Sequence, residues 1–180
     1  MIKVGVAIIT RPLIFFCGLY WINVDYVSTG EGDYSKWLGP DWKPDWSNPS
    51  TIVSNHVSWF DIIVALVYFC PSFVSKNSVK KYPGVGRIAI AIECVFFDRA
   101  GSKEEKWGVV ELIKQRQLEN EKLGKPSILI YPEGSTTNGE QLIAFKRGAF
   151  QHLNSVQPTA LKYRSSNGVS IQNDVLYGLL

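Results

Sequence analysis

The sequence has few of the residues that build disulfide frameworks or metal centres. Its 180 residues include three cysteines and two histidines. Cys17, Cys70 and Cys94 are odd in number and are not spaced in pairs, so the sequence predicts neither a disulfide-stabilised fold nor a transition-metal site. We therefore expect free thiols in a reducing compartment and no bound metal.

The chain also lacks a hydrophobic run long enough to be an obvious membrane span. Residues 4–24 are apolar apart from Arg11 and a few weakly polar positions, and the uninterrupted part runs only from Pro12 to Ile22. A span needs roughly 20 apolar residues, and Pro12 should bend any helix here. We predict an N-terminal segment, residues 1–27, whose bent helix is half-inserted in a membrane or lies in its interface. The alternatives are a signal peptide and a buried core helix.

Neither sign of charge dominates, because 19 Lys and Arg stand against 16 Asp and Glu. We accordingly expect no nucleic-acid partner. The positive charge is nevertheless uneven, with six cations from Lys76 to Lys103 against Glu93 and Asp98. Such a stretch can attract phosphate groups or an anionic membrane leaflet. A solvated basic face is the alternative.

The remainder of the sequence divides into a linker and an α/β pattern. Residues 28–50 are rich in Gly, Pro, Ser, Asp and Trp, which is typical of a linker. From residue 51 onward, β-type runs alternate with helical ones, which predicts an α/β domain over residues 51–164. Residues 165–180 form a tail that we do not assign.

The pattern also places the individual elements of this domain. We expect strands in the runs 51–55, 72–76, 94–97, 126–134 and 156–163. Helices are expected at 59–69 and 144–153. An amphipathic helix should follow the capping box of Ser102 and Glu105 and end at Gly124.

His56 and Asp61 stand in the string NHVSWFD, where a strand gives way to a helix. Within one regular helix a spacing of five would put them on different faces. A turn at the helix start would instead bring Asp61 back to the imidazole. The pair would then have the base-and-orienter arrangement of the serine-hydrolase triad, with the substrate's own hydroxyl as the attacking group. A helix-capping role for His56 is the alternative.

Two further polar clusters follow hydrophobic strands. Asp98 and Arg99 come directly after one run, and Glu133 and Gly134 come at the end of the next. Strand ends are where α/β folds place their sites. An arginine there can bind a phosphate with two nitrogens, although a surface ion pair with Asp98 or Glu93 is the alternative. Glu133 can orient a basic residue or a substrate hydroxyl, or it can cap the turn.

The sequence lacks a properly placed motif for a serine hydrolase or for a dinucleotide-binding enzyme. The serine-hydrolase elbow G-x-S-x-G is absent around Ser135. The string GVGRIA at 84–89 fits a dinucleotide fingerprint on paper, but it follows SVKKYP rather than a strand. No phosphate-binding turn is therefore expected there.

Four motifs occur in order along the domain: NHxSxxD, FxDR, PEGxT and FKxGAF. In this order and spacing they resemble the glycerolipid (PlsC-like) acyltransferase family. The longer strings PEGSTTNG, FKRGAF and VQPTALKY are most similar to its lysophosphatidylcholine and lysophosphatidylethanolamine acyltransferase branch. The resemblance covers about residues 50–164. It implies a mixed, mostly parallel central sheet flanked by helices and preceded by a membrane-associated helix.

The resemblance also implies roles for individual residues. His56 becomes the catalytic base and Asp61 its partner, while Arg99 and the Glu133-Gly134 turn bind the glycerophosphate of the acceptor. Pro158, in the string VQPTALKY, belongs to the fourth motif of that family. The motifs further assign four residues to substrate binding: Asn55, Ser58, Ser135 and Lys146.

The reaction implied is transfer of a fatty acyl group from acyl-CoA, a co-substrate, to the free hydroxyl of a lysophospholipid, with no cofactor. Its setting would be the endoplasmic reticulum membrane, with the active site on the cytosolic face. The alternatives are acylation of 1-acylglycerol-3-phosphate, CoA-independent transacylation between phospholipids, and an inactive membrane-docking module of the same fold.

Overall fold

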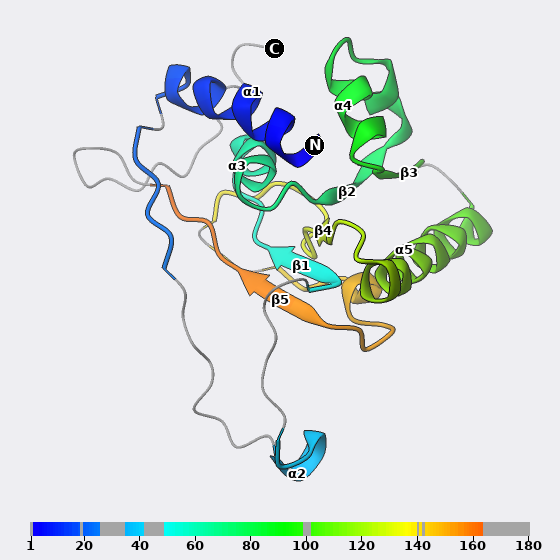
Figure 1. Ribbon diagram of the computed structural model, residues 1–180. Coiled ribbons are helices and arrows are strands. Elements are labelled where there is room, and N and C mark those ends of the chain that lie inside the picture. The colour runs from blue at the N-terminus through cyan, green and yellow to red at the C-terminus, as the bar shows by residue number, and fades with distance from the viewer. Residues whose placement is uncertain are drawn as a thin grey trace.

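A computed structural model describes residues 2–18, 20–25, 35–41, 49–98, 102–139, 141 and 143–163. Its sheet has the strand order β3-β2-β4-β1-β5 (Figure 1). The strands are β1 (Thr51–Ser54), β2 (Ser72–Lys76), β3 (Val95–Phe97), β4 (Ile128–Ile130) and β5 (Val156–Thr159). Each lies within the run predicted for it. Every pairing between these strands is parallel, where we expected some antiparallel pairing as well.

The helices agree with the sequence pattern less completely than the strands do. They are α1 (Ile2–Phe16), α2 (Ser35–Leu38), α3 (Phe60–Tyr68), α4 (Val85–Ala91) and α5 (Lys103–Leu123), with 3₁₀ turns η1 (Asn77–Lys81) and η2 (Arg147–Ala149). The predicted helices at 59–69 and after the capping box are confirmed. We did not predict α4, which follows the turn η1 and confirms that no strand precedes the sequence GVGRIA.

The helix predicted at 144–153 is wrong, because only the single turn η2 forms there. The backbone of Lys146 is extended, with φ −75° and ψ 139°. Its N–H donates to the carbonyl of Pro132 at 2.9 Å, and not to a carbonyl of its own segment. This bond fastens the segment to the turn after β4, in a conformation that a helix cannot adopt.

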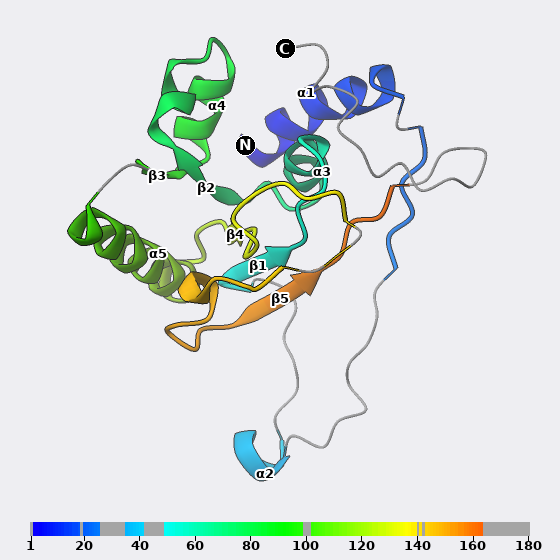
Figure 2. The ribbon, with the colours of Figure 1, turned by 180° about the vertical axis from the view of Figure 1, so that it is seen from behind.

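Helices cover both faces of the sheet. Alternate residues of a strand point to opposite sides, so neighbouring residues of β1 contact different helices. Ile52 of β1 packs with Ala65 and Leu66 of α3 in the main apolar cluster. On the opposite face the neighbouring Thr51 bonds α5, whose Gln117 donates to its hydroxyl at 2.7 Å. Helix α1 packs on the outside of α3, and the two views show α3 and α5 on different sides of the sheet (Figures 1 and 2).

The buried face of α5 is polar as well as apolar, and the predicted amphipathic pattern describes it poorly. Ile113, Arg116, Gln117 and Asn120 are all buried there. Gly124 ends the helix with φ +63°, as its position predicted, and its N–H donates to the carbonyl of Asn120 at 2.9 Å. The N-terminal capping box falls partly outside the described side chains. Helix α5 is therefore joined to the sheet by hydrogen bonds as much as by apolar contact.

The N-terminal segment forms a helix that contains Pro12. Among the described residues, no helix has the length and apolarity that crossing a membrane requires. Of the predicted linker the structure describes 35–41 and 49–50, which include the short helix α2. The predicted tail at 165–180 lies outside the described residues.

The parallel arrangement brings the carboxyl ends of all five strands to one edge. Strand β1 lies between β4 and β5, so the residues that follow these three strands are neighbours there. Strand β3 is three strand spacings from β1, or about 14 Å. The predicted cluster after β3 therefore leaves the sheet well away from the residues that follow β1.

Candidate active site

The residues after β1 form a tight turn that places Asp61 against His56. Strand β1 ends at Ser54 and α3 begins at Phe60, so Asp61 lies in the first turn of the helix. The Nδ1 atom of His56 is 2.8 Å from Asp61 Oδ2. The turn predicted from the five-residue spacing is therefore present, and the imidazole bonds Asp61 rather than capping α3.

The Asp61 carboxylate is fully buried and bonded through both oxygens. Its Oδ2 also accepts the backbone N–H groups of Val57 at 2.7 Å and Ser58 at 2.9 Å. Its Oδ1 accepts the hydroxyl of Tyr163 at 2.5 Å. Since Oδ2 acts as an acceptor, His56 must donate its Nδ1 proton to it, and Nε2 is then the ring nitrogen that can accept a proton.

Tyr131 and Thr137, which both follow β4, contact the ring and the backbone of His56. Tyr131 stacks on the imidazole, with ring centroids 4.0 Å apart and planes 15° from parallel. The N–H of Thr137 donates to the His56 carbonyl at 2.8 Å. The side chain of His56 is 16% exposed. The imidazole is thus fixed in orientation while part of it stays exposed.

Asn55 and Ser58, which the motifs assign to substrate binding, make contacts within the chain. The carboxamide of Asn55 donates to the Leu161 carbonyl at 2.9 Å and accepts the Leu161 N–H at 2.8 Å. This double hydrogen bond ties the turn after β1 to the segment after β5. The Ser58 hydroxyl accepts the Phe60 N–H at 3.3 Å, at the start of α3.

The turn after β4 brings Glu133, Gly134 and Lys146 together near the pair of His56 and Asp61, called the dyad below. Gly134 has φ +73°, and a Cβ placed on it would overlap the ammonium end of Lys146. Glu133 is 3% exposed, and its Oε2 has no hydrogen-bond partner among the described residues. Ser135 is exposed. The turn therefore places the Lys146 cation, the backbone of Gly134 without a side chain, and the buried carboxylate of Glu133 at the same sheet edge as His56.

Arg99 lies outside the described residues, so its predicted contact is not tested. Its neighbour Asp98 accepts the Asn77 side-chain amide at 2.7 Å. A cavity of about 490 Å³ lies between β3 and α5, lined by Phe97, Leu112 and others. This cavity is on the β3 side of the sheet and does not include His56.

Burial and the nearby Asp61 charge raise the pKa of both Tyr131 and Tyr163 well above the usual range. For Tyr163 the hydrogen bond to Asp61 raises the pKa further. Both phenols therefore remain protonated at working pH. Sequence reasoning assigned neither tyrosine, although Tyr131 directly precedes PEG and Tyr163 ends the string VQPTALKY.

Comparison with known proteins gives a consistent result over the same region. The family model for Acyltransferase matches residues 38–162. A lysophospholipid acyltransferase, LPEAT1 of Arabidopsis thaliana, is 35% identical over 86% of this chain and 42% of its own length. Lysophosphatidylcholine acyltransferase 2 of Mus musculus is 33% identical over 86% of this chain and 27% of its own length. The chain thus spans less than half of either relative.

A bacterial relative and a solved structure extend the comparison. A lyso-ornithine lipid O-acyltransferase of Pseudomonas aeruginosa is 38% identical over 64% of this chain and 44% of its own length. The crystal structure of the 1-acyl-sn-glycerophosphate acyltransferase PlsC from Thermotoga maritima is 23% identical, with a TM-score of 0.44 over 60% of this chain and 40% of that one. The family match covers well over half of the chain and includes the His56–Asp61 turn, so the chain belongs to the acyltransferase family.

Proposed function

We propose that this chain transfers a fatty acyl group from acyl-CoA to the free hydroxyl of a lysophospholipid of the lysophosphatidylcholine or lysophosphatidylethanolamine type. The observation that carries the proposal is the His56 imidazole, whose Nδ1 is held by buried Asp61. The similar relatives named as lysophospholipid acyltransferases support this choice of acceptor.

In the proposed reaction Nε2 of His56 removes the proton of the lysolipid hydroxyl as its oxygen attacks the thioester carbonyl. A new C–O bond forms and the carbonyl becomes a tetrahedral intermediate. The C–S bond then breaks, and the CoA sulfur leaves with the proton that the imidazolium carries. Asp61 stabilises the imidazolium between these steps through its bond to Nδ1. The products are a diacyl phospholipid and free CoA.

The acceptor would bind across the turn after β4. The ammonium of Lys146 lies against Gly134, where an anionic phosphate of the lysolipid can reach it. The unpartnered Oε2 of Glu133 can accept a hydrogen bond from a hydroxyl of the glycerol. Arg99 would bind the phosphate from the end of β3, and Ser135 would add a hydroxyl at the exposed end of the turn.

The donor would approach from the basic turn after β2. Lys76, Lys80, Lys81 and Arg87 are exposed there, and β2 is two strand spacings from β1, or about 10 Å. CoA carries several phosphate groups at the end remote from its thiol. Cations at this separation can bind those phosphates while the thioester reaches His56.

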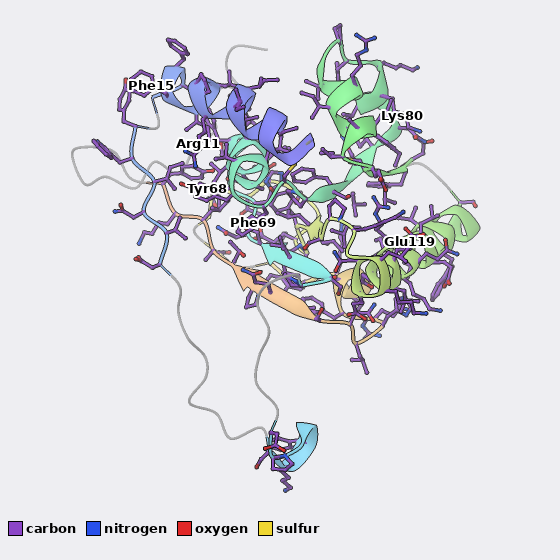
Figure 3. The ribbon with its side chains drawn as sticks, in the orientation of Figure 1. Arg11, Phe15, Tyr68, Phe69, Lys80 and Glu119 are labelled. Atoms are coloured by element: carbon purple, nitrogen blue, oxygen red, sulfur yellow. The ribbon has the colours of Figure 1, made fainter. Side chains whose placement is uncertain are left out.

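The proposed setting is the cytosolic face of the endoplasmic reticulum membrane. Helix α1 exposes large apolar side chains that its packing on α3 leaves uncovered, including Ile8 at 65%, Ile9 at 66% and Phe16 at 84% exposed. Phe15 lies at the outer end of the helix (Figure 3). Among the described residues Cys17, Cys70 and Cys94 form no disulfide, which suits a reducing compartment.

The test is a panel of acceptors supplied to the purified protein with labelled acyl-CoA in detergent or vesicles. We expect label in phosphatidylcholine or phosphatidylethanolamine from the matching lysolipid. Preferred labelling of 1-acylglycerol-3-phosphate would support the alternative acceptor, and labelling from a phospholipid without CoA would support transacylation. Absence of transfer to every acceptor would contradict the proposal and favour an inactive docking module.

The role of Arg99 can be tested in the same assay. Lysine keeps the charge but loses the two-nitrogen fork. Arg99→Lys should therefore raise the KM for the lysolipid more than the KM for acyl-CoA. Equal effects on both substrates would count against an acceptor-binding role.

A further inference from the structure

Tyr163 lies beyond the last strand, yet it is joined to the centre of the site. We infer that Tyr163 is a positioning residue for the acyl transfer proposed above, on which this inference rests: acting through Asp61, its hydroxyl keeps His56 in the tautomer and orientation in which Nε2 accepts a proton. The distance from the Tyr163 oxygen to Asp61 Oδ1 is 2.5 Å.

The two oxygens of Asp61 are bonded by different partners. Oδ2 receives the His56 ring and two backbone N–H groups, whereas Tyr163 is the donor recorded on Oδ1. Asp61 is 0% exposed, so solvent does not replace a missing donor without a rearrangement. A buried carboxylate oxygen that loses its donor is costly. We expect the carboxylate to rotate in search of another donor, which would weaken its bond to Nδ1.

The chain delivers Tyr163 to this place by a specific route. Strand β5 pairs with β1 up to the Ser54–Thr159 register. The double hydrogen bond between Asn55 and Leu161 continues the attachment past the strand end. Tyr163 then lies two residues further on, beside Asp61. Asn55 thereby holds both the turn that carries His56 and the segment that carries Tyr163.

The chemistry of the phenol limits what it can do. Burial and the Asp61 charge raise the pKa of Tyr163, so it remains a proton donor and is neither a base nor a nucleophile. Its hydroxyl faces Oδ1, whereas His56 bonds Oδ2. Tyr131, the other tyrosine beside the dyad, stacks on the ring and its hydroxyl has no partner among the described residues. The two tyrosines therefore act on His56 in different ways, one through a hydrogen bond and one through ring contact.

The experiment removes the hydroxyl and follows the imidazole directly. In Tyr163→Phe the ring stays and only the donor is lost. Tyr68→Phe, on the exposed face of α3, is the matched control. Nitrogen-15 NMR of labelled histidine reports which ring nitrogen carries the proton, and the chain has two histidines, so His152→Gln identifies the His56 signals.

In the unsubstituted protein we expect a protonated Nδ1 with a downfield proton and a bare Nε2. In Tyr163→Phe that proton should move upfield and exchange faster with water, while Tyr68→Phe keeps the original spectrum. The value of kcat should fall about tenfold, with KM for both substrates within about twofold. A 3-fluorotyrosine at position 163, which keeps a stronger donor, should restore both the spectrum and kcat.

The outcomes separate this inference from the reaction itself, because the NMR measurement needs no substrate. An unchanged His56 spectrum in Tyr163→Phe would overturn the positioning role, even in a protein that transfers acyl groups. A changed spectrum in a protein that transfers nothing would support the hydrogen-bond chain while contradicting the proposed reaction. Equal loss of kcat in Tyr163→Phe and the fluorotyrosine protein would also refute the role.

Discussion

At the scale of single residues, the site depends on one ring nitrogen that is left available while the other is fixed. If His56 is the base of the proposed reaction, His56→Ala removes the proton acceptor, so the rate should fall by about 10² to 10⁴-fold while lysolipid binding persists. Asp61→Asn should approach this loss, because an amide no longer fixes the tautomer. The measurements are steady-state rates and equilibrium binding of a lysolipid. Near-normal turnover by purified His56→Ala would remove His56 as the base.

Gly134 is required by its conformation and by its close neighbour. A side chain at φ +73° is strained, and a Cβ there would overlap the ammonium end of Lys146. We expect Gly134→Ala to lower the free energy of unfolding by about 1–3 kcal/mol and to raise the lysolipid KM by displacing Lys146. Chemical denaturation and steady-state kinetics measure these effects.

Gly108 provides the control for that substitution. It lies in α5, where an added Cβ meets nothing within 4 Å, so Gly108→Ala should leave KM unchanged and raise stability by up to about 1 kcal/mol. If the two alanine variants behaved alike, the turn after β4 would not need glycine for the reason given.

The residues of the site differ in how far the sequence could reveal them. His56 and Asp61 are close in the chain, so a local turn and one motif were enough to predict their contact. The contact of Tyr163 with Asp61 joins residues 102 positions apart. It depends on which strand becomes the neighbour of β1, and no local pattern contains that information. Arg99 was predicted from the same kind of motif as His56, and its contact stays a prediction.

At the scale of elements, α5 is held to the sheet by a polar cluster at the edge opposite the site. The guanidinium of Arg116 donates to the Ser72 hydroxyl at 3.2 Å and the Glu93 carbonyl at 3.1 Å. It also pairs with the Glu93 carboxylate at 2.5 Å. Ser72 begins β2, and Glu93 precedes β3. One side chain of α5 therefore bonds the chain at the N-terminal ends of two strands.

This cluster predicts a pH dependence of stability. The hydrogen bond from Arg116 lowers the pKa of the Glu93 carboxyl. A group whose pKa is lower in the folded protein stabilises it above the unfolded pKa, and the contribution is lost as the pH falls through the folded pKa. Acidification below about pH 4 should thus weaken the protein. Glu93→Gln should flatten this dependence without changing kcat.

Denaturant unfolding across pH 3 to 7 measures the effect, with Glu111→Gln as the control. Glu111 pairs with Lys114 within one exposed helical face, at 3.4 Å, so removing it leaves the junction with the sheet intact. Parallel pH profiles for Glu93→Gln and the unsubstituted protein would show that Glu93 does not couple protonation to folding.

The elements themselves were predicted unevenly, for a physical reason. The strands lie in short runs of β-type residues bounded by polar turns, a signal that is local in the sequence. The segment at 144–153 has helical composition, but Lys146 bonds to Pro132 across the site, and this tertiary contact overrides local preference. The face of α5 was misjudged because the buried side chains of Arg116 and Gln117 make hydrogen bonds to the sheet and its turns, which a hydrophobicity pattern does not show.

At the scale of the whole molecule, the face formed by α1 and the residues after it predicts how the protein attaches to membranes. Eight large apolar side chains are exposed there: Ile8, Ile9, Leu13, Phe15, Phe16, Tyr20, Trp21 and Val24. Burying them in an interface at roughly 1.5 kcal/mol each gives a gross term above about 10 kcal/mol. Attachment should therefore survive 1 M salt, where the Debye length is about 3 Å, and should be lost in detergent.

Fractionation of membranes in salt and in detergent measures this, with two variants to separate the contributions. Phe16→Glu should weaken attachment at high salt, whereas Lys80→Gln, in the basic turn on a different part of the molecule (Figure 3), should not. If the unsubstituted protein left membranes in 1 M salt, attachment would be electrostatic, and the hypothesis that residues 4–24 are embedded in the membrane would be wrong.

The double hydrogen bond between Asn55 and Leu161 joins residues 106 positions apart, and this has a consequence during protein synthesis. The N-terminal helix leaves the ribosome first, whereas the strand that completes the dyad's surroundings leaves more than a hundred residues later. At about 5–20 residues per second, that interval lasts roughly 7 to 28 seconds. A nascent chain can therefore expose the apolar side chains of α1 before the hydrogen bonds around His56 have formed.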